Sequence, residues 1–102
     1  MYAVIRRYEG IEKTRTEEIR RSINDDFVPM IREMSGYHGY WVIETDDAIA
    51  TIGLFETQRD AEESTQMARE FISDHELQDA LPKPPQVTAG EVTVAGPVHA
   101  LA

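Results

Sequence analysis

The sequence lacks cysteine altogether, which excludes disulfides, thiolate metal sites and cysteine nucleophiles. It also lacks a glycine-rich phosphate loop, so it indicates no nucleotide cofactor. The histidines, His38, His75 and His99, are too far apart in the sequence to suggest a metal site. We therefore expect a protein that uses neither a metal nor an organic cofactor.

Long apolar runs are missing as well. No stretch approaches the roughly 18 apolar residues that a membrane-spanning helix needs. The opening residues, MYAVIRRYEG, show no basic segment followed by a long apolar run, so they do not indicate a signal peptide. By elimination we expect a cytoplasmic protein with no membrane partner.

Basic residues are scarce. The chain has 10 Lys and Arg against 19 Asp and Glu, which gives a formal net charge of −9. This charge repels phosphate backbones, so we expect no nucleic-acid partner. A length of 102 residues is typical of one domain. We place this domain at residues 1–95 and expect a loose C-terminal tail over 96–102.

The first half of the chain predicts a strand, a helix and a hairpin. Residues 2–8 alternate and are rich in β-formers. Thr14 with Glu17 fits a capping box, and apolar residues then recur at helical spacing as far as Ser35-Gly36. Pro29 lies inside this helix and predicts a kink near residues 25–29. The stretch 37–55 reads as two strands around an acidic turn.

The second half predicts one more helix and one more strand. Thr57 with Asp60 fits a helix cap, and an inner stripe of small and apolar residues runs from Ala61 to His75. LPKPPQ, residues 81–86, cannot be helical and reads as an extended connector, followed by a strand over 87–94. The order β-α-β-β-α-β predicts an α+β ferredoxin-like fold: a four-stranded antiparallel sheet with two helices on one face.

The hairpin has no polar side. Both alternating sets of its residues are largely apolar, so the sheet face without helices would expose apolar side chains whichever way the hairpin is turned. Exposed patches of this kind mark interfaces. The simplest cover is a second copy of the sheet, which predicts a homodimer through the sheet face. The alternative is a monomer that tolerates an apolar face.

The element order, the passage MIREMSGYHGYWV and the run TIGLFET together resemble the dimeric α/β-barrel superfamily, and in particular its antibiotic-biosynthesis-monooxygenase-like domains. The resemblance covers nearly the whole chain. It implies a ligand pocket inside each protomer, between the helices and the sheet. Members of the superfamily include cofactor-free quinone-forming monooxygenases, haem-degrading enzymes and proteins with no known reaction.

The haem-degrading branch does not fit the residues. The resemblance would require an Asn in the first strand, a Trp in the second helix and a His about ten residues later. The first strand offers Arg6 and Arg7 instead, and the second helix has no tryptophan. Only His75 roughly matches, so we do not expect haem degradation.

The hairpin supplies most of the candidate pocket residues. A three-residue turn at 45–47 would place Gly39 opposite Gly53, with Tyr37 facing Phe55 and Trp41 facing Thr51. The two glycines would then form a notch in an aromatic face. The notch either admits a planar ligand or is filled by the small residues of the second helix. Two further candidates lie on the helices: Asn24 and Phe71.

Three residues are candidates for catalysis, each with a structural alternative. Trp41 could wall a pocket and donate its indole N–H, or pack in the core or an interface. His75 could act as a base at the pocket mouth, or complement the dipole at the end of its helix. Arg6 could bind an oxyanion, or pair with Glu91 across the sheet. Because Arg6 and Arg7 alternate, one of them must point inward.

Cofactor-free oxygenation requires an apolar site, a group that accepts a proton and donors for the developing oxyanion. The sequence therefore predicts a cofactor-independent monooxygenase, or a related enzyme, acting on a phenolic or polyketide-like molecule. The alternative is a non-catalytic homodimer that binds a small apolar or aromatic ligand or a protein partner. The scarcity of convergent acid–base groups favours this second hypothesis.

Overall fold

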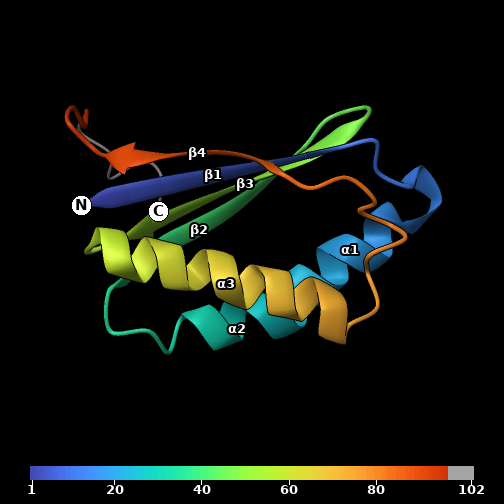
Figure 1. The fold of residues 1–102 in the computed structure, drawn as a ribbon, viewed down its shortest axis with the longest axis horizontal. Coiled ribbons are helices and arrows are strands. Elements are labelled where there is room, and N and C mark those ends of the chain that lie inside the picture. The colour runs from blue at the N-terminus through green and yellow to red at the C-terminus, as the bar shows by residue number, and fades with distance from the viewer. Residues whose placement is uncertain (97–102) are drawn as a thin grey trace.

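Four antiparallel strands form one sheet, and all the helices cover the same face of it (Figure 1). The structure is a computed structural model and describes residues 1–96. The strands are β1 (Tyr2–Glu9), β2 (Tyr37–Glu44), β3 (Ala48–Phe55) and β4 (Gln86–Glu91). Their order across the sheet is β2-β3-β1-β4. The predicted ferredoxin-like arrangement is confirmed, while nearly all of the predicted tail lies outside the described residues.

The first helical stretch is divided into four short pieces. A 3-10 turn, η1 (Lys13–Arg15), leads into α1 (Thr16–Ser22), a π-helical segment η2 (Ile23–Phe27) and α2 (Val28–Ile31). Pro29 lacks the N–H that a regular helix would donate four residues back. The π-helical segment ends two residues before Pro29 and overlaps the region of the predicted kink, while the kink itself stays a prediction.

The second helix, α3 (Gln58–Asp74), lies along the sheet and is capped as predicted: Thr57 accepts a hydrogen bond from the Asp60 N–H at 3.1 Å. The first cap was predicted wrongly. Thr14 caps no helix, since its hydroxyl donates to the Glu12 side chain at 3.0 Å.

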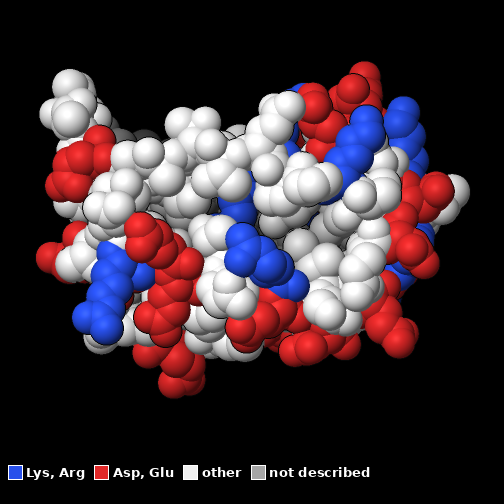
Figure 2. Space-filling view, in the orientation of Figure 1, with Lys and Arg blue, Asp and Glu red and all other residues white. Residues whose placement is uncertain are grey.

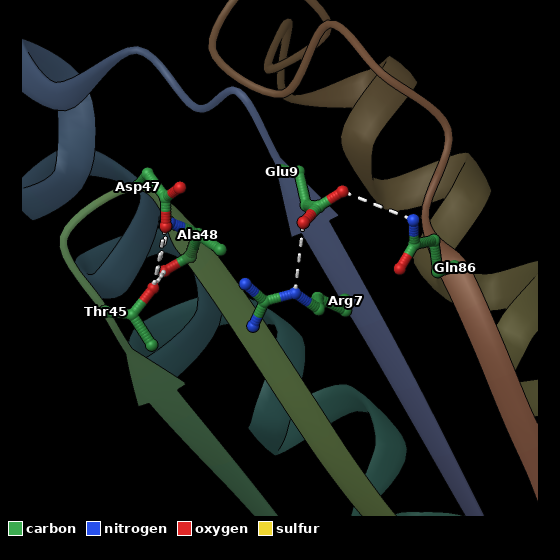
Figure 3. A network of polar contacts seen from close by, with 6 residues as sticks. All are labelled: Arg7, Glu9, Thr45, Asp47, Ala48 and Gln86. Carbon is green, nitrogen blue, oxygen red and sulfur yellow. Dashed lines mark hydrogen bonds and ion pairs between the residues drawn. The ribbon is translucent and has the colours of Figure 1, made fainter.

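The hairpin turn is one residue shorter than predicted. Asp46 and Asp47 form a two-residue turn, closed by a hydrogen bond from the Thr45 N–H to the Ala48 carbonyl at 2.9 Å. The Thr45 hydroxyl also donates to this carbonyl at 3.2 Å and to Asp47 at 3.4 Å (Figure 3). The side chain of Thr45 therefore holds the turn together.

The shorter turn shifts the hairpin register. Tyr40, and not Gly39, lies opposite Gly53, while Gly39 lies opposite Leu54. An irregularity between Tyr37 and Gly39 then restores the predicted pair of Tyr37 with Phe55, whose ring centroids are 6.4 Å apart. The paired glycines predicted from the sequence were therefore wrong.

The core lies between the sheet and the helices. Small residues on α3, Ala61, Ser64 and Ala68, are buried and allow the helix to lie close to the strands. The larger core side chains come from every layer: Val4, Tyr8, Ile19, Phe27, Ile31, Ile49, Phe55, Phe71 and Leu77.

The opposite face of the sheet has no helix over it (Figure 1). Its middle is apolar, because Ile5 pairs with Ile52 across β1 and β3, and Trp41 pairs with Ile52 across β2 and β3. Ile5 is 37% exposed and Ile43 is 48% exposed. The polar residues Arg7, Glu9 and Gln86 lie at one end of the sheet, where Glu9 accepts from both of the others (Figure 3).

No helix within residues 1–96 is long and apolar enough to cross a membrane. In the same range, no three His, Asp or Glu side chains gather as ligands for a metal ion.

Candidate functional site

Arg6 is the only buried charged side chain of residues 1–96, with 1% of its surface exposed. It points from β1 toward the helices, because Val4 and Tyr8 on either side of it are buried there too. Its Nη1 donates to the Thr65 hydroxyl at 2.8 Å, and its Nη2 donates to the Tyr40 hydroxyl at 3.2 Å. Side chains from α3 and β2 thus fix the guanidinium.

Neither contact of Arg6 supplies a negative charge. Both acceptors are neutral hydroxyls, and the Arg6 Nε has no hydrogen-bond partner. The predicted partner Glu91 lies opposite Tyr2 and contacts the N-terminal amine of Met1 at 3.4 Å, so the predicted Arg6–Glu91 pair was wrong. A buried charge without a partner is strongly disfavoured. The site is therefore suited to an anion that enters from outside.

A cleft of about 530 Å³ reaches Arg6 from the surface. Its floor is formed by β1 and β4, one wall by α3 and the other by the connector before β4. The lining residues are Arg6, Tyr8, Thr65, Arg69, Ile72, Ser73, Gln78, Leu81, Pro82, Lys83, Pro84, Pro85 and Val87. This volume lies in the range of small-molecule sites, about 300–1,000 Å³.

The cleft is basic although the chain is acidic. Three of its lining residues are cationic, Arg6, Arg69 and Lys83, and none is Asp or Glu. Figure 2 shows basic atoms in the middle of this face of the molecule, with acidic atoms below them and at both ends. A local positive potential of this kind attracts anions.

A smaller apolar cavity of about 30 Å³ lies deeper, between the sheet and the first helical stretch. Phe27, Phe71 and Tyr40 help to line it, and Tyr8 lines both this cavity and the cleft. The Thr51 hydroxyl faces this region, is buried and has no hydrogen-bond partner. The cavity is too small for an organic ligand. We therefore take the cleft, and not the cavity, as the candidate ligand site.

Tyr8 is positioned to contact a ligand in the cleft as a neutral phenol. Burial raises the pKa of its hydroxyl above the ordinary value, and the nearby charge of Arg6 only partly opposes this. Tyr8 therefore keeps its proton at neutral pH. It can donate a hydrogen bond to an oxyanion, but it is a poor base.

The structure separates the predicted hairpin residues between the two faces of the sheet. Trp41 and Gly39 lie on the face without helices, so neither lines the cleft, and the predicted role of Trp41 as a pocket wall was wrong. The physical reason is the two-residue turn, which shifts the register by one residue and so places Gly39 and Trp41 on the other face, while the irregularity after Tyr37 returns only Tyr37 to the helix side.

Protein rings fill the space above both glycines. A Cβ on Gly39 would lie 2.6 Å from the ring of Trp41, and a Cβ on Gly53 would lie 2.6 Å from the ring of Phe55. Each glycine thus accommodates the aromatic residue two positions later on its own strand. Phe55 is fully buried and packs with Tyr37 at the end of the core, away from the cleft.

His75 and Asn24 lie outside the cleft. The ring of His75 stacks on Phe71 with centroids 3.9 Å apart, and its Nδ1 contacts the Phe71 carbonyl at 3.2 Å. This is the helix-end role that the sequence offered as the alternative. Asn24 is exposed and donates to Asp25 at 3.0 Å. Of the predicted residues, only Arg6 lines the cleft, while Phe71 lines the apolar cavity behind it.

Sequence reasoning missed Tyr8, Tyr40 and Thr65. Tyr8 could have been found, because it is two residues from Arg6 on a strand and must share its face. Thr65 lies one helical turn after the inward residue Ala61. Tyr40 could not have been placed, because its face depends on the length of the hairpin turn.

No protein-family model and no curated protein matches this sequence. Solved structures do match. A monooxygenase of Streptomyces coelicolor, solved with nanaomycin D, superimposes with a TM-score of 0.73 at 12% identity and covers 92% of this chain and 88% of its own. A proposed antibiotic biosynthesis monooxygenase of Nitrosomonas europaea gives a TM-score of 0.71 at 18% identity, covering 92% and 100%.

A dimeric ferredoxin-like protein from an uncultured marine organism gives a TM-score of 0.69 at 10% identity, covering 93% of this chain and 90% of its own. At such identities these similarities concern the fold. They confirm that the chain has the ferredoxin-like fold of the antibiotic-biosynthesis-monooxygenase-like proteins, as its sequence passages had suggested.

Proposed function

We propose that the cleft binds a phenolic or polyketide-like molecule as its anion, and that the protein promotes oxygenation of this molecule without a cofactor. The observation that carries the proposal is Arg6: a guanidinium 1% exposed, held by two neutral hydroxyls and lacking any acidic partner within residues 1–96. The choice of oxygenation as the reaction is supported by the Streptomyces coelicolor monooxygenase, which has the same fold.

The chemistry follows from placing a developing oxyanion beside a cation. A phenol or enol loses a proton, and the resulting electron-rich anion reduces dioxygen. The oxygen then bonds to the ring carbon as a hydroperoxide, which loses water to leave a carbonyl, so that a CH₂ group and O₂ become C=O and H₂O. Arg6 stabilises the anion in a poorly solvated site, where such stabilisation is strongest.

The lining of the cleft contains no carboxylate and no histidine to take the proton. Tyr8 keeps its own proton because burial raises its pKa. Arg6 therefore acts by lowering the pKa of the substrate hydroxyl, and the proton leaves to water in the open part of the cleft. This suits substrates with a CH₂ group that readily form an electron-rich anion, such as anthrones.

The absence of a general base from the lining also favours a second function. A cleft that binds an anion without turning it over would use the same residues. In that case the protein is a ligand-binding module, and Arg6 contributes affinity alone.

We also propose that the protein is a homodimer whose sheets face each other. No described helix or strand covers the apolar face around Ile5, Ile52 and Trp41. Each large apolar side chain left in water forfeits about 1.5–3 kcal/mol. The ferredoxin-like protein of the same fold that is described as dimeric supports this arrangement. The cytoplasmic location stays a prediction.

Oxygen uptake tests the enzymatic proposal. The wild-type protein is incubated in air with a panel of anthrones, hydroquinones and flavonoids, and oxygen consumption is followed with an electrode. Arg6→Met keeps the length of the side chain and removes its charge, so we expect it to lower uptake by about 100-fold or more, as the loss of an oxyanion donor does. Arg59→Met, at an exposed position on α3, is the matched control and should retain full uptake.

The two functions separate in the same experiment. Ligand binding that depends on Arg6, without oxygen uptake, supports the ligand-binding module. Absence of both binding and uptake across the panel would remove the proposal.

A further inference from the structure

Three cations from three separate segments converge on the cleft. Arg6 belongs to β1, Arg69 to α3 and Lys83 to the proline-rich connector, and all three line the same space. Acidic residues outnumber basic ones by 19 to 10 in the chain, yet none of them lines this cleft. The neighbouring hollow, which shares Arg69 with the cleft, includes one acidic residue, Glu62.

None of the three cations of the cleft forms an ion pair with a described residue, which is also true of Lys13, Arg32 and Arg59 outside it. Among residues 1–96, four arginines outside the cleft form ion pairs with glutamates: Arg7, Arg15, Arg20 and Arg21. By contrast, Arg69 donates only to the Gln66 side-chain oxygen, at 2.7 Å. The residues three and four positions away from Arg69 on α3 are Thr65, Gln66, Ile72 and Ser73, so no intrahelical ion pair is open to it.

Lys83 is placed by its contact with the loop that follows β1. A Cβ on Gly10 would lie 3.1 Å from the Lys83 Cε, so the stem of the lysine lies against the bare glycine backbone. Gly10 has φ of +63°, a conformation that favours glycine in its own right. Lys83 and Arg69 are both exposed lining residues, and together they form the rim of the cleft. Lys83 has no acidic partner among the described residues.

The rest of the cleft lining is mostly apolar. Ile72, Leu81, Val87 and three prolines of the connector belong to it, and its other polar residues are Tyr8, Thr65, Ser73 and Gln78. A buried cation, a largely apolar lining and two exposed cations suit a molecule with one acidic oxygen at one end, a hydrophobic body and a second anionic group at the other end.

We propose that the ligand of this cleft carries a carboxylate in addition to its phenolic or enolic oxygen, and that Arg69 and Lys83 bind that carboxylate while Arg6 binds the oxygen. The inference rests on the proposed function only in taking the cleft as the ligand site. It adds a specificity: among aromatic molecules of equal size, the cleft selects acids over their neutral counterparts.

A matched ligand pair tests this selectivity by binding alone. We would titrate the protein with 6-hydroxy-2-naphthoate, whose hydroxyl and carboxylate lie at opposite ends of the ring system, and with its methyl ester, following ligand fluorescence at pH 7 and low salt. The acid should bind about five- to tenfold more tightly than the ester, the effect of roughly 1 kcal/mol from one added charge interaction. Added salt should reduce this preference, since the rim is exposed to solvent.

Point variants test whether Arg69 and Lys83 cause the preference for the acid over the ester. Arg69→Gln and Lys83→Gln should each lower the affinity for the acid and leave that for the ester unchanged. Arg6→Met should weaken both ligands. Arg59→Gln, which removes the same charge from an exposed position of α3, should change neither. Equal binding of acid and ester, or an equal loss with Arg59→Gln, would overturn the inference, because the selectivity would then be absent or due to overall charge.

The outcome is separable from that of the oxygenation proposal. If the acid binds through Arg69 and Lys83 but no oxygen is consumed, the carboxylate site stands and oxygenation fails. If neutral anthrones are oxygenated through Arg6 while acid and ester bind alike, oxygenation stands and the carboxylate site fails. If neither naphthoate binds, the carboxylate site is wrong.

Discussion

Arg6 shows how much one buried side chain can indicate about function. Removing a guanidinium from water carries a penalty of several kcal/mol unless charge and hydrogen bonds compensate for it. Here two hydroxyls compensate in part and no carboxylate does so within residues 1–96. Tyr8, two residues along, is the second polar group of the site, and burial raises its pKa further above neutral pH.

The protonation of Tyr8 predicts a pH effect on stability. Burial raises the pKa of Tyr8 in the folded protein above its ordinary value of 10.0. The folded state therefore holds this proton more tightly than the unfolded state does. The protonated Tyr8 hydroxyl therefore contributes fully to stability below about pH 10. This contribution is lost as the pH rises through the pKa that Tyr8 has in the folded protein.

Tyr8→Phe tests this effect, since it removes the titrating group and keeps the ring. The free energy of unfolding in urea should fall less steeply between about pH 9 and 11 in the variant than in the wild type. Tyr2→Phe, on the same strand but only half-buried, is the control and should keep the wild-type slope. Equal slopes for wild type and Tyr8→Phe would contradict the assignment.

At the scale of elements, caps and short irregularities decide the geometry. The sequence offers two similar cap patterns, at Thr14 and Thr57, but only Thr57 caps a helix. The 3-10 turn η1 takes the place where Thr14 would have capped, and its own cap is Glu12. A tertiary contact helps to fix that turn: the Glu12 N–H donates to the Ala80 carbonyl at 2.9 Å.

The difference between the two threonines is measurable. Thr57→Ala should lower the free energy of unfolding by about 1 kcal/mol, because it leaves N–H groups at the start of α3 without an acceptor. Thr14→Ala should change it by less than about 0.5 kcal/mol, as at other exposed positions. Denaturant unfolding of both variants measures this. A larger loss for Thr14→Ala than for Thr57→Ala would show that the first cap forms after all.

For the whole molecule, the main question is what covers the bare face of the sheet. Helices cover one side only, and the apolar residues of β1, β2 and β3 face outward on the other. A two-fold copy would remove this surface from water in a single self-complementary contact. The cleft with Arg6 lies on the helix side, so dimerisation through the sheet leaves it accessible.

Ile5→Glu tests the dimer. It places a charge in the middle of the bare face, where two copies would bury it twice. Analytical ultracentrifugation should show a dimer for the wild type at about 10 µM and a shift toward monomer for the variant, because an unpaired buried charge is strongly disfavoured. Met30→Glu, an exposed position on α2, adds the same charge on the helix side and should remain dimeric. A folded monomeric wild type would refute the arrangement.

The sequence alone determined the order of elements, the fold and the irregular first helix. These follow from local causes: periodicity sets strand and helix, and Pro29 lacks an N–H wherever the chain places it. It also required one arginine of the pair Arg6 and Arg7 to point inward, since a strand alternates. The apolar hairpin predicted an uncovered face for the same reason.

Only the tertiary structure decided which residues meet. A turn shorter by one residue placed Trp41 on the bare face and brought Tyr40 to Arg6. The alternation of apolar residues along this hairpin does not fix its register, because both faces are apolar. A shift of one residue between the strands fits the alternation equally well, yet it exchanges the side chains of the two faces. The basic cleft is likewise invisible in the sequence, since its cations stand at positions 6, 69 and 83 and converge only through the packing of α3 and the connector on the sheet.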